Sequence, residues 1–185
     1  KQNSRPARLS FNGDTYTGMN ASESFSEEDY DYAQETLRIL SGLYGVLRPL
    51  DLIQPYRLEM GTKLETEYGK NLYEFWGNSL TESLNKALGE SPGEKVLINL
   101  ASNEYFKSVH ADELEFPVMT PIFLDRKDEG DYKTVSFYAK RARGSMASWI
   151  IRNRVSQSEQ FQEFAENGYE FCSERSKNQS PVFIR

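Results

Sequence analysis

The chain has 185 residues, which is long enough to bury a core in one domain or in two small ones. Its residues are 38% hydrophobic and 27% charged with a net charge of −6, and no apolar run reaches the roughly 18–20 residues that span a bilayer, so we expect a globular protein without a membrane partner. One cysteine and one histidine exclude a disulfide framework and the usual zinc, haem and iron–sulfur sites, and we expect no metal and no cofactor.

The first half of the chain is predicted to contain a strand and two helices, at residues 8–11, 26–41 and 71–88. Alternating apolar residues predict the strand, and Asn12-Gly13-Asp14 is a strong turn signal after it. Ser26 and Asp29 have the spacing of a weak capping box at the start of the first helix. The second helix has apolar residues at helical spacing.

The second half mixes helices and strands without a regular order. Strands are predicted at residues 95–100, 118–124, 132–138, 169–172 and 181–184, and helices at residues 103–109, 139–155 and 159–166. The apolar run 95–100 has the composition of a strand buried on both faces. The irregular order favours an α+β fold, with a mixed sheet and surrounding helices in a single domain over residues 1–185.

Two glycines with the spacing Gly-x-x-Gly follow the first predicted helix. In a helix-hairpin-helix element, the backbone N–H groups of Gly42, Leu43, Tyr44 and Gly45 would face a nucleic-acid phosphate, and Arg48 would add a charge beyond them. The alternative is that Gly42 only ends the helix, while Gly45 allows a tight turn.

Basic residues are concentrated near the C-terminus. Residues 1–132 carry a net charge of −10 and residues 133–185 a net charge of +4, and residues 133–154 include six basic side chains and no acidic one. Lys140, Arg141 and Arg143 lie where aromatic residues lead into a predicted helix, a pattern that suits a phosphate-rich ligand. The same pattern also fits a solvated basic helix face above an aromatic core.

Small polar residues follow the predicted strand 95–100. Ser102 and Asn103 could face a crevice at the end of that strand, or could simply cap the helix that follows. Arg57 and Glu59 lie on one side of an extended segment, where they could pair with each other or line a cleft.

The usual catalytic signatures are missing from the sequence. It contains no P-loop and no nucleophile elbow, so no reaction can be assigned and an enzyme is the less favoured class.

Five blocks of sequence, in a fixed order along the chain, carry a resemblance to a known family. They lie at residues 11–18, 40–51, 54–61, 99–107 and 136–144. Through these blocks the chain resembles the YaaA peroxide-stress family. The resemblance implies a cytoplasmic bacterial protein that limits hydrogen peroxide damage and helps keep intracellular free iron low. It also implies a compact α+β fold, with a helix-hairpin-helix at residues 41–46 and a positively charged cleft that binds DNA. The family's N-terminal segment, with a Ser-Pro-Ala-Lys motif, does not precede Lys1, so we expect part of the site to be absent.

The first hypothesis is therefore a non-enzymatic protein that binds the DNA backbone with weak sequence specificity. Its expected DNA contacts are Gly42, Leu43, Tyr44, Gly45, Arg48, Arg57, Lys107, Lys140, Arg141 and Arg143. The alternative is an enzyme that acts on a nucleotide or nucleobase in the basic cleft, and a small nucleotide-like ligand would then be a partner. A third reading, iron binding by the acidic residues of segment 27–31, competes with their role at a helix start.

Overall fold

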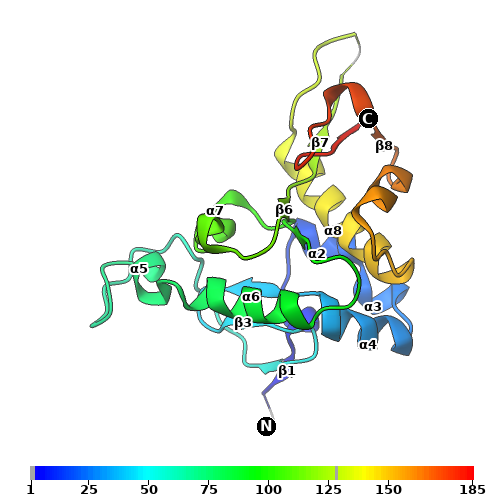
Figure 1. The fold of residues 1–185 in the computed structure, drawn as a ribbon. Coiled ribbons are helices and arrows are strands. Elements are labelled where there is room, and N and C mark those ends of the chain that lie inside the picture. Colours follow the sequence, from blue (N-terminus) through cyan, green and yellow to red (C-terminus); the bar gives the residue numbers. More distant parts are fainter. Residues whose placement is uncertain (1–2, 128) are drawn as a thin grey trace.

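The computed structural model describes residues 3–127 and 129–185 and shows short helices and strands mixed along the chain (Figure 1). The first half contains β1 (Arg5–Pro6), α1 (Ala7–Ser10), α2 (Asp14–Met19), α3 (Ala21–Ser24), α4 (Glu27–Thr36), β2 (Ile39–Ser41), β3 (Gly45–Leu47), β4 (Leu52–Ile53), α5 (Leu72–Trp76) and α6 (Ser79–Glu90). The second half contains β5 (Leu97–Ile98), α7 (Asn103–Phe106), β6 (Val118–Met119), β7 (Ile122–Leu124), α8 (Ser136–Arg152), β8 (Glu170–Phe171) and β9 (Val182–Ile184). Three short 3-10 helices cover Ala111–Glu113, Ser158–Glu163 and Ser173–Arg175.

The strands form four small sheets in the described residues instead of the one mixed sheet that the sequence predicts. Two are antiparallel pairs, β1 with β4 and β2 with β3, and a third is the parallel pair of β5 and β6. In the fourth, β9 lies between a parallel β7 and an antiparallel β8. The mixed α/β character of a single compact domain is confirmed. None of the helices in the described ranges has the length and apolar character needed to cross a membrane.

The main core lies between α8 and the sheet that contains β7 and β9. Ala142 and Met146 of α8 are fully buried there against Phe123 and Phe183, whose rings stack at 5.4 Å. Aromatic side chains make up much of this cluster, and such contacts add to the free energy of folding beyond the area they bury. The core therefore fixes α8, the helix that carries the basic segment.

Two glycines allow α2 and α8 to lie in direct contact, as the neighbouring positions of the two helices in Figure 1 show. A β-carbon on Gly144 would overlap the carbonyl oxygen of Thr15, and one on Gly18 would overlap the carbonyl oxygen of Arg141. The backbones approach so closely that only glycine fits at either position. This contact places the start of α2 beside the first turns of α8.

Local apolar patterns account for the wrong element predictions. The predicted strand at residues 8–11 is the helix α1, because four residues are too few to separate alternation from one helical turn. The predicted helix 71–88 is interrupted at Gly77, whose φ is 49°. The predicted strand 132–138 is also wrong, because α8 begins at Ser136.

The helix-hairpin-helix element is not confirmed, because the Gly-x-x-Gly segment joins two strands. The helix predicted to reach Ser41 ends at Thr36, and residues 39–41 then pair with residues 45–47 in an antiparallel hairpin. Gly45 has a φ of 74°, which a turn between strands requires and which side chains disfavour. The alternative prediction of a tight turn at Gly45 describes this geometry.

The capping box of α4 is confirmed and gives a pH-dependent contribution to stability. Asp29 accepts a hydrogen bond from the Ser26 backbone N–H at 2.9 Å and pairs with Arg154 at 2.6 Å. The backbone hydrogen bond, opposed by burial and aided by Arg154, lowers the pKa of the Asp29 carboxyl. A lowered folded-state pKa stabilises the fold above the unfolded value of about 4, and this contribution is lost as the pH falls through the folded-state pKa.

We therefore expect Asp29→Asn to have a lower free energy of unfolding than the wild type at about pH 7. Between pH 7 and about pH 3, the variant should lose less stability than the wild type does. Urea unfolding followed by circular dichroism at both pH values measures this difference. Asp31→Asn, at an exposed position of the same helix, is the matched control. Equal acid sensitivity in the wild type and Asp29→Asn would contradict the assignment.

Candidate functional site

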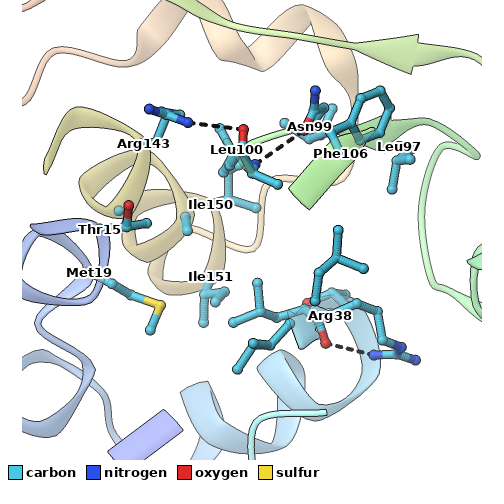
Figure 2. Close-up of a pocket in the computed structure, with 18 of the residues that line it drawn as sticks. Thr15, Met19, Arg38, Leu97, Asn99, Leu100, Phe106, Arg143, Ile150 and Ile151 are labelled. Atoms are coloured by element: carbon cyan, nitrogen blue, oxygen red, sulfur yellow. Dashed lines mark hydrogen bonds between the residues drawn. The ribbon is translucent and has the colours of Figure 1, made fainter. Parts of the chain in front are cut away.

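An open cavity of about 650 Å³ lies between α2, the end of β5, α7 and α8. Figure 2 shows Arg143 reaching from α8 toward the segment after β5, while Arg38 lies toward the opposite side of the cavity. Apolar side chains dominate the part near Arg38. Polar side chains from the start of α2 and from α8 also line the cavity, and we call this part the donor end after four of them, Asn12, Tyr16, Lys140 and Arg143.

The Arg143 guanidinium is half-buried in the wall of the donor end. Its Nε donates to the Ala139 carbonyl at 3.2 Å and its Nη1 to the Ala101 carbonyl at 3.0 Å. Its charge is therefore partly removed from water, and this burial lowers the pKa of Arg143. Among the described residues no carboxylate pairs with it. Arg143 is therefore a fixed cation without a counter-ion.

Most other arginines of the basic segment are already paired. Arg152 pairs with Glu166 at 2.5 Å and Arg154 with Asp29 at 2.6 Å. Arg141 lies 3.9 Å from Asp14 and over the ring of Phe137. The segment is therefore not a continuous basic face, and the prediction from charge alone overestimated the free positive charge. Exposed Lys140 has no ion pair within the described part of the chain.

The carboxylates that line the donor end each have a partner. Asp14 faces Arg141, and Glu59 lies 3.8 Å from Arg57. Glu104 accepts a hydrogen bond from the Gly61 N–H at 2.9 Å. Glu104 is therefore hydrogen-bonded, whereas Asp14 and Glu59 are ion-paired at distances longer than a hydrogen bond.

Tyr16 and Asn12 belong to the donor end although the sequence did not single them out. The Tyr16 hydroxyl makes no hydrogen bond with the described residues, and burial, with Tyr105 and Tyr56 nearby, raises its pKa, so it remains a protonated donor. Asn12 Oδ1 accepts from the Gly13 N–H at 2.9 Å, and its amide nitrogen makes no hydrogen bond with the residues that the structure describes. Both residues lie in the matched block 11–18, and that position is the sequence signal that could have identified them.

Ser102, which follows β5, caps the next helix, and this is one of the two roles that the sequence analysis considered for it. Ser102 caps α7 and accepts from the Tyr105 N–H at 3.4 Å. Asn99 Oδ1 accepts from the Ala101 N–H and so shapes the loop that presents the Ala101 carbonyl to Arg143. Ser102 also lines the cavity, so capping and exposure to the cavity coexist.

The predicted hairpin donors are largely occupied within the fold. Leu43 and Tyr44 both donate their backbone N–H groups to the Ser41 hydroxyl, at 3.2 and 2.9 Å. Gly42 is buried, and a β-carbon there would lie 2.5 Å from the Leu58 carbonyl oxygen. Gly45 packs against Trp76. The geometry shows why glycine is needed at positions 42 and 45 without invoking a ligand.

The remaining predicted DNA contacts lie outside the lining of the cavity. Arg48 pairs with Asp51 at 3.2 Å, and Lys107 lies over the ring of Tyr73. Arg57 is 91% exposed at its side chain. The structure therefore brings Lys140 and Arg143 together in the lining of the cavity. Arg48 and Lys107 lie outside the lining, and Arg57 lies outside it next to the lining residue Glu59.

The fold and site define a mixed α/β domain with an open cavity that is rich in unsatisfied donors at one end. A comparison with known proteins identifies the family. The family model for peroxide stress protein YaaA matches residues 1–175, and the chain belongs to this family. It is also 55% identical over 184 residues to a UPF0246 protein of Tolumonas auensis, an alignment that covers all of this chain and 70% of that protein.

Proposed function

We propose that this protein acts in the peroxide stress response by binding the phosphate backbone of DNA through the donor end of its cavity. The observation that carries the proposal is the pair of cations at that end, Lys140 and Arg143, which have no carboxylate partner among the described residues. A cation that is fixed and partly dehydrated gains most from an anion that also accepts hydrogen bonds, and phosphate is such an anion.

Binding of this kind depends on the local potential and not on the net charge. The protein as a whole carries −6, so a DNA strand would be attracted only where basic side chains are free. Exposed Arg57 and Lys107 would add contacts at the periphery. The N–H groups of Leu43 and Tyr44 are already donated to Ser41, so we assign the phosphate contacts to side chains.

We further propose that the protein helps to keep intracellular free iron low by an indirect route, without storing iron itself. Within the acidic segment 27–31, Asp29 is hydrogen-bonded to Ser26 and ion-paired with Arg154. This favours a role at the helix start over iron binding.

The proposal predicts a salt-dependent interaction that Lys140→Glu weakens. Because each lost phosphate contact lowers the slope of log K against log salt by about 0.9, we expect a slope smaller by about one unit and an affinity at least tenfold lower at about 50 mM salt. Fluorescence anisotropy with labelled duplex DNA between about 50 and 200 mM salt measures both quantities.

Lys86→Glu is the matched control, because it makes the same charge change at an exposed position of α6. Equal losses in the two variants would indicate general electrostatic attraction instead of a located site. If the wild type does not bind duplex DNA at low salt, the proposed function is wrong.

A further inference from the structure

We propose that the donor end accepts one unpaired nucleotide, with its phosphate at Arg143 and Lys140 and its base beside the aromatic side chains of the cavity. The inference refines the proposed function, because it states which part of a nucleic acid enters the site. It rests on donors that have no acceptor among the described residues, on the cost of an unpaired, partly buried charge and on the aromatic lining.

Several donors at this end have no acceptor within the described part of the chain. The Asn12 amide nitrogen, the Tyr16 hydroxyl and the Lys140 ammonium make no hydrogen bond with the described residues, and Arg143 uses only Nε and Nη1. Of the carboxylates beside them, Glu104 accepts one hydrogen bond, and Asp14 and Glu59 each face an arginine, as described above. A ligand that complements such a surface must offer several acceptor atoms and negative charge, and a phosphate group does both.

Arg143 favours anion binding more strongly than an exposed cation would. A charge that is partly removed from water is costly unless it is paired and hydrogen-bonded. Two backbone carbonyls fix the guanidinium, but carbonyls carry no net charge. The side of the Arg143 guanidinium that makes no hydrogen bond with the described residues is therefore available to an anion. Lys140 lies one turn earlier on α8 and can reach the same anion.

Aromatic rings line the cavity next to these donors. Phe11 and Tyr16 stack with ring centroids 5.3 Å apart, and Tyr105 also contributes to the wall. Bases stack on such side chains, which favours a nucleotide over phosphate alone. The cavity volume of about 650 Å³ lies within the range of about 300–1,000 Å³ that is typical of small-ligand sites.

A nucleotide within a duplex cannot place its base in such a cavity, because the base is stacked and paired. The occupant is therefore a free nucleotide or an unpaired nucleotide of a DNA strand, which share the same chemistry. Isothermal titration calorimetry with dAMP, deoxyadenosine, inorganic phosphate, a single-stranded oligonucleotide and the corresponding duplex distinguishes these sources.

We expect dAMP to bind more tightly than either deoxyadenosine or inorganic phosphate. Loss of a hydrogen bond to a charged group corresponds to about a tenfold loss of affinity or more, so Lys140→Ala and Tyr16→Phe should each weaken dAMP about tenfold. Lys86→Ala and Tyr68→Phe make the same changes at exposed positions outside the cavity and should bind dAMP as the wild type does. Circular dichroism shows whether each variant is folded.

The results separate this inference from the proposed function. If duplex DNA binds but neither dAMP nor the single strand does, the inference is wrong and backbone binding stands. If dAMP binds and the duplex does not, the inference stands and the proposed function is wrong. The inference is also wrong if inorganic phosphate binds as tightly as dAMP, because the base would then contribute nothing. It is equally wrong if Tyr16→Phe and Lys140→Ala both fold and both bind dAMP normally, because dAMP would then bind elsewhere.

Discussion

Gly144→Ala is expected to lower the free energy of unfolding by about 3 kcal/mol or more, at or above the usual upper limit for overpacking a core. The added β-carbon would overlap the Thr15 carbonyl oxygen and lie 2.6 Å from the Met19 nitrogen. Both are backbone atoms, so no side-chain rotation can relieve the contact and α2 must move away from α8. Urea unfolding followed by circular dichroism measures the loss.

Gly89→Ala is the matched control, because a β-carbon at Gly89, near the end of α6, would meet no atom within 4 Å. Alanine there should be neutral or stabilising by up to about 1 kcal/mol, since glycine is the poorer helix former. If Gly144→Ala were as stable as the wild type, the close contact of the two helices would be wrong. Where Gly144→Ala still folds, dAMP binding should also fall, because α2, which carries Tyr16, would move relative to Arg143 in the lining of the cavity.

This contact shows why the site could be predicted only in part. The blocks around Asn12 and Arg143 could be recognised in the sequence, and Lys140 and Arg143 have no ion pair among the described residues. What the sequence does not contain is the distance between α2 and α8, which depends on glycines 126 positions apart in the chain, Gly18 and Gly144. Without that contact Tyr16 could not line the same cavity as Arg143.

Charge counting was misleading for a related reason. The acidic partners of Arg152 and Arg154, Glu166 and Asp29, lie outside the basic segment and reach it only through the fold. Local signals were more dependable, because a capping box or an N-cap depends on residues within one turn. The Ser26 box and the Ser102 cap were therefore predictable, whereas the pairing of strands with long connections was not.

Asp125→Ala is expected to destabilise the fold by about 3 kcal/mol. Buried Asp125 accepts from Arg185 Nε at 2.8 Å and Nη2 at 2.5 Å, and from the Tyr169 hydroxyl at 2.8 Å. Removal of one partner of a buried ion pair costs about 3–5 kcal/mol, and the lower end applies because the Arg185 side chain is 33% exposed. Burial and the Asp125 hydrogen bond raise the pKa of Tyr169, so its hydroxyl stays a donor that would lose its acceptor.

The control is Arg57→Ala, which removes the exposed Arg57–Glu59 pair and should change stability by no more than about 0.5 kcal/mol. Urea unfolding at low and high salt compares the two variants, and the loss in Asp125→Ala should depend little on salt because the pair is screened poorly. A loss below about 1 kcal/mol would mean that Arg185 is solvated well enough to replace its partner with water.

The same network reaches the candidate site, so Asp125→Ala should also weaken dAMP binding. The Arg185 guanidinium lies 4.4 Å from the ring centroid of Tyr138, in the first turn of α8, and 4.7 Å from that of Tyr169. Release of Arg185 would loosen the turn that precedes Lys140, whereas the Gly144 contact holds the helix one turn further on. A variant that loses stability but binds dAMP with wild-type affinity would show that the core alone positions Lys140 and Arg143, independently of the Asp125 network.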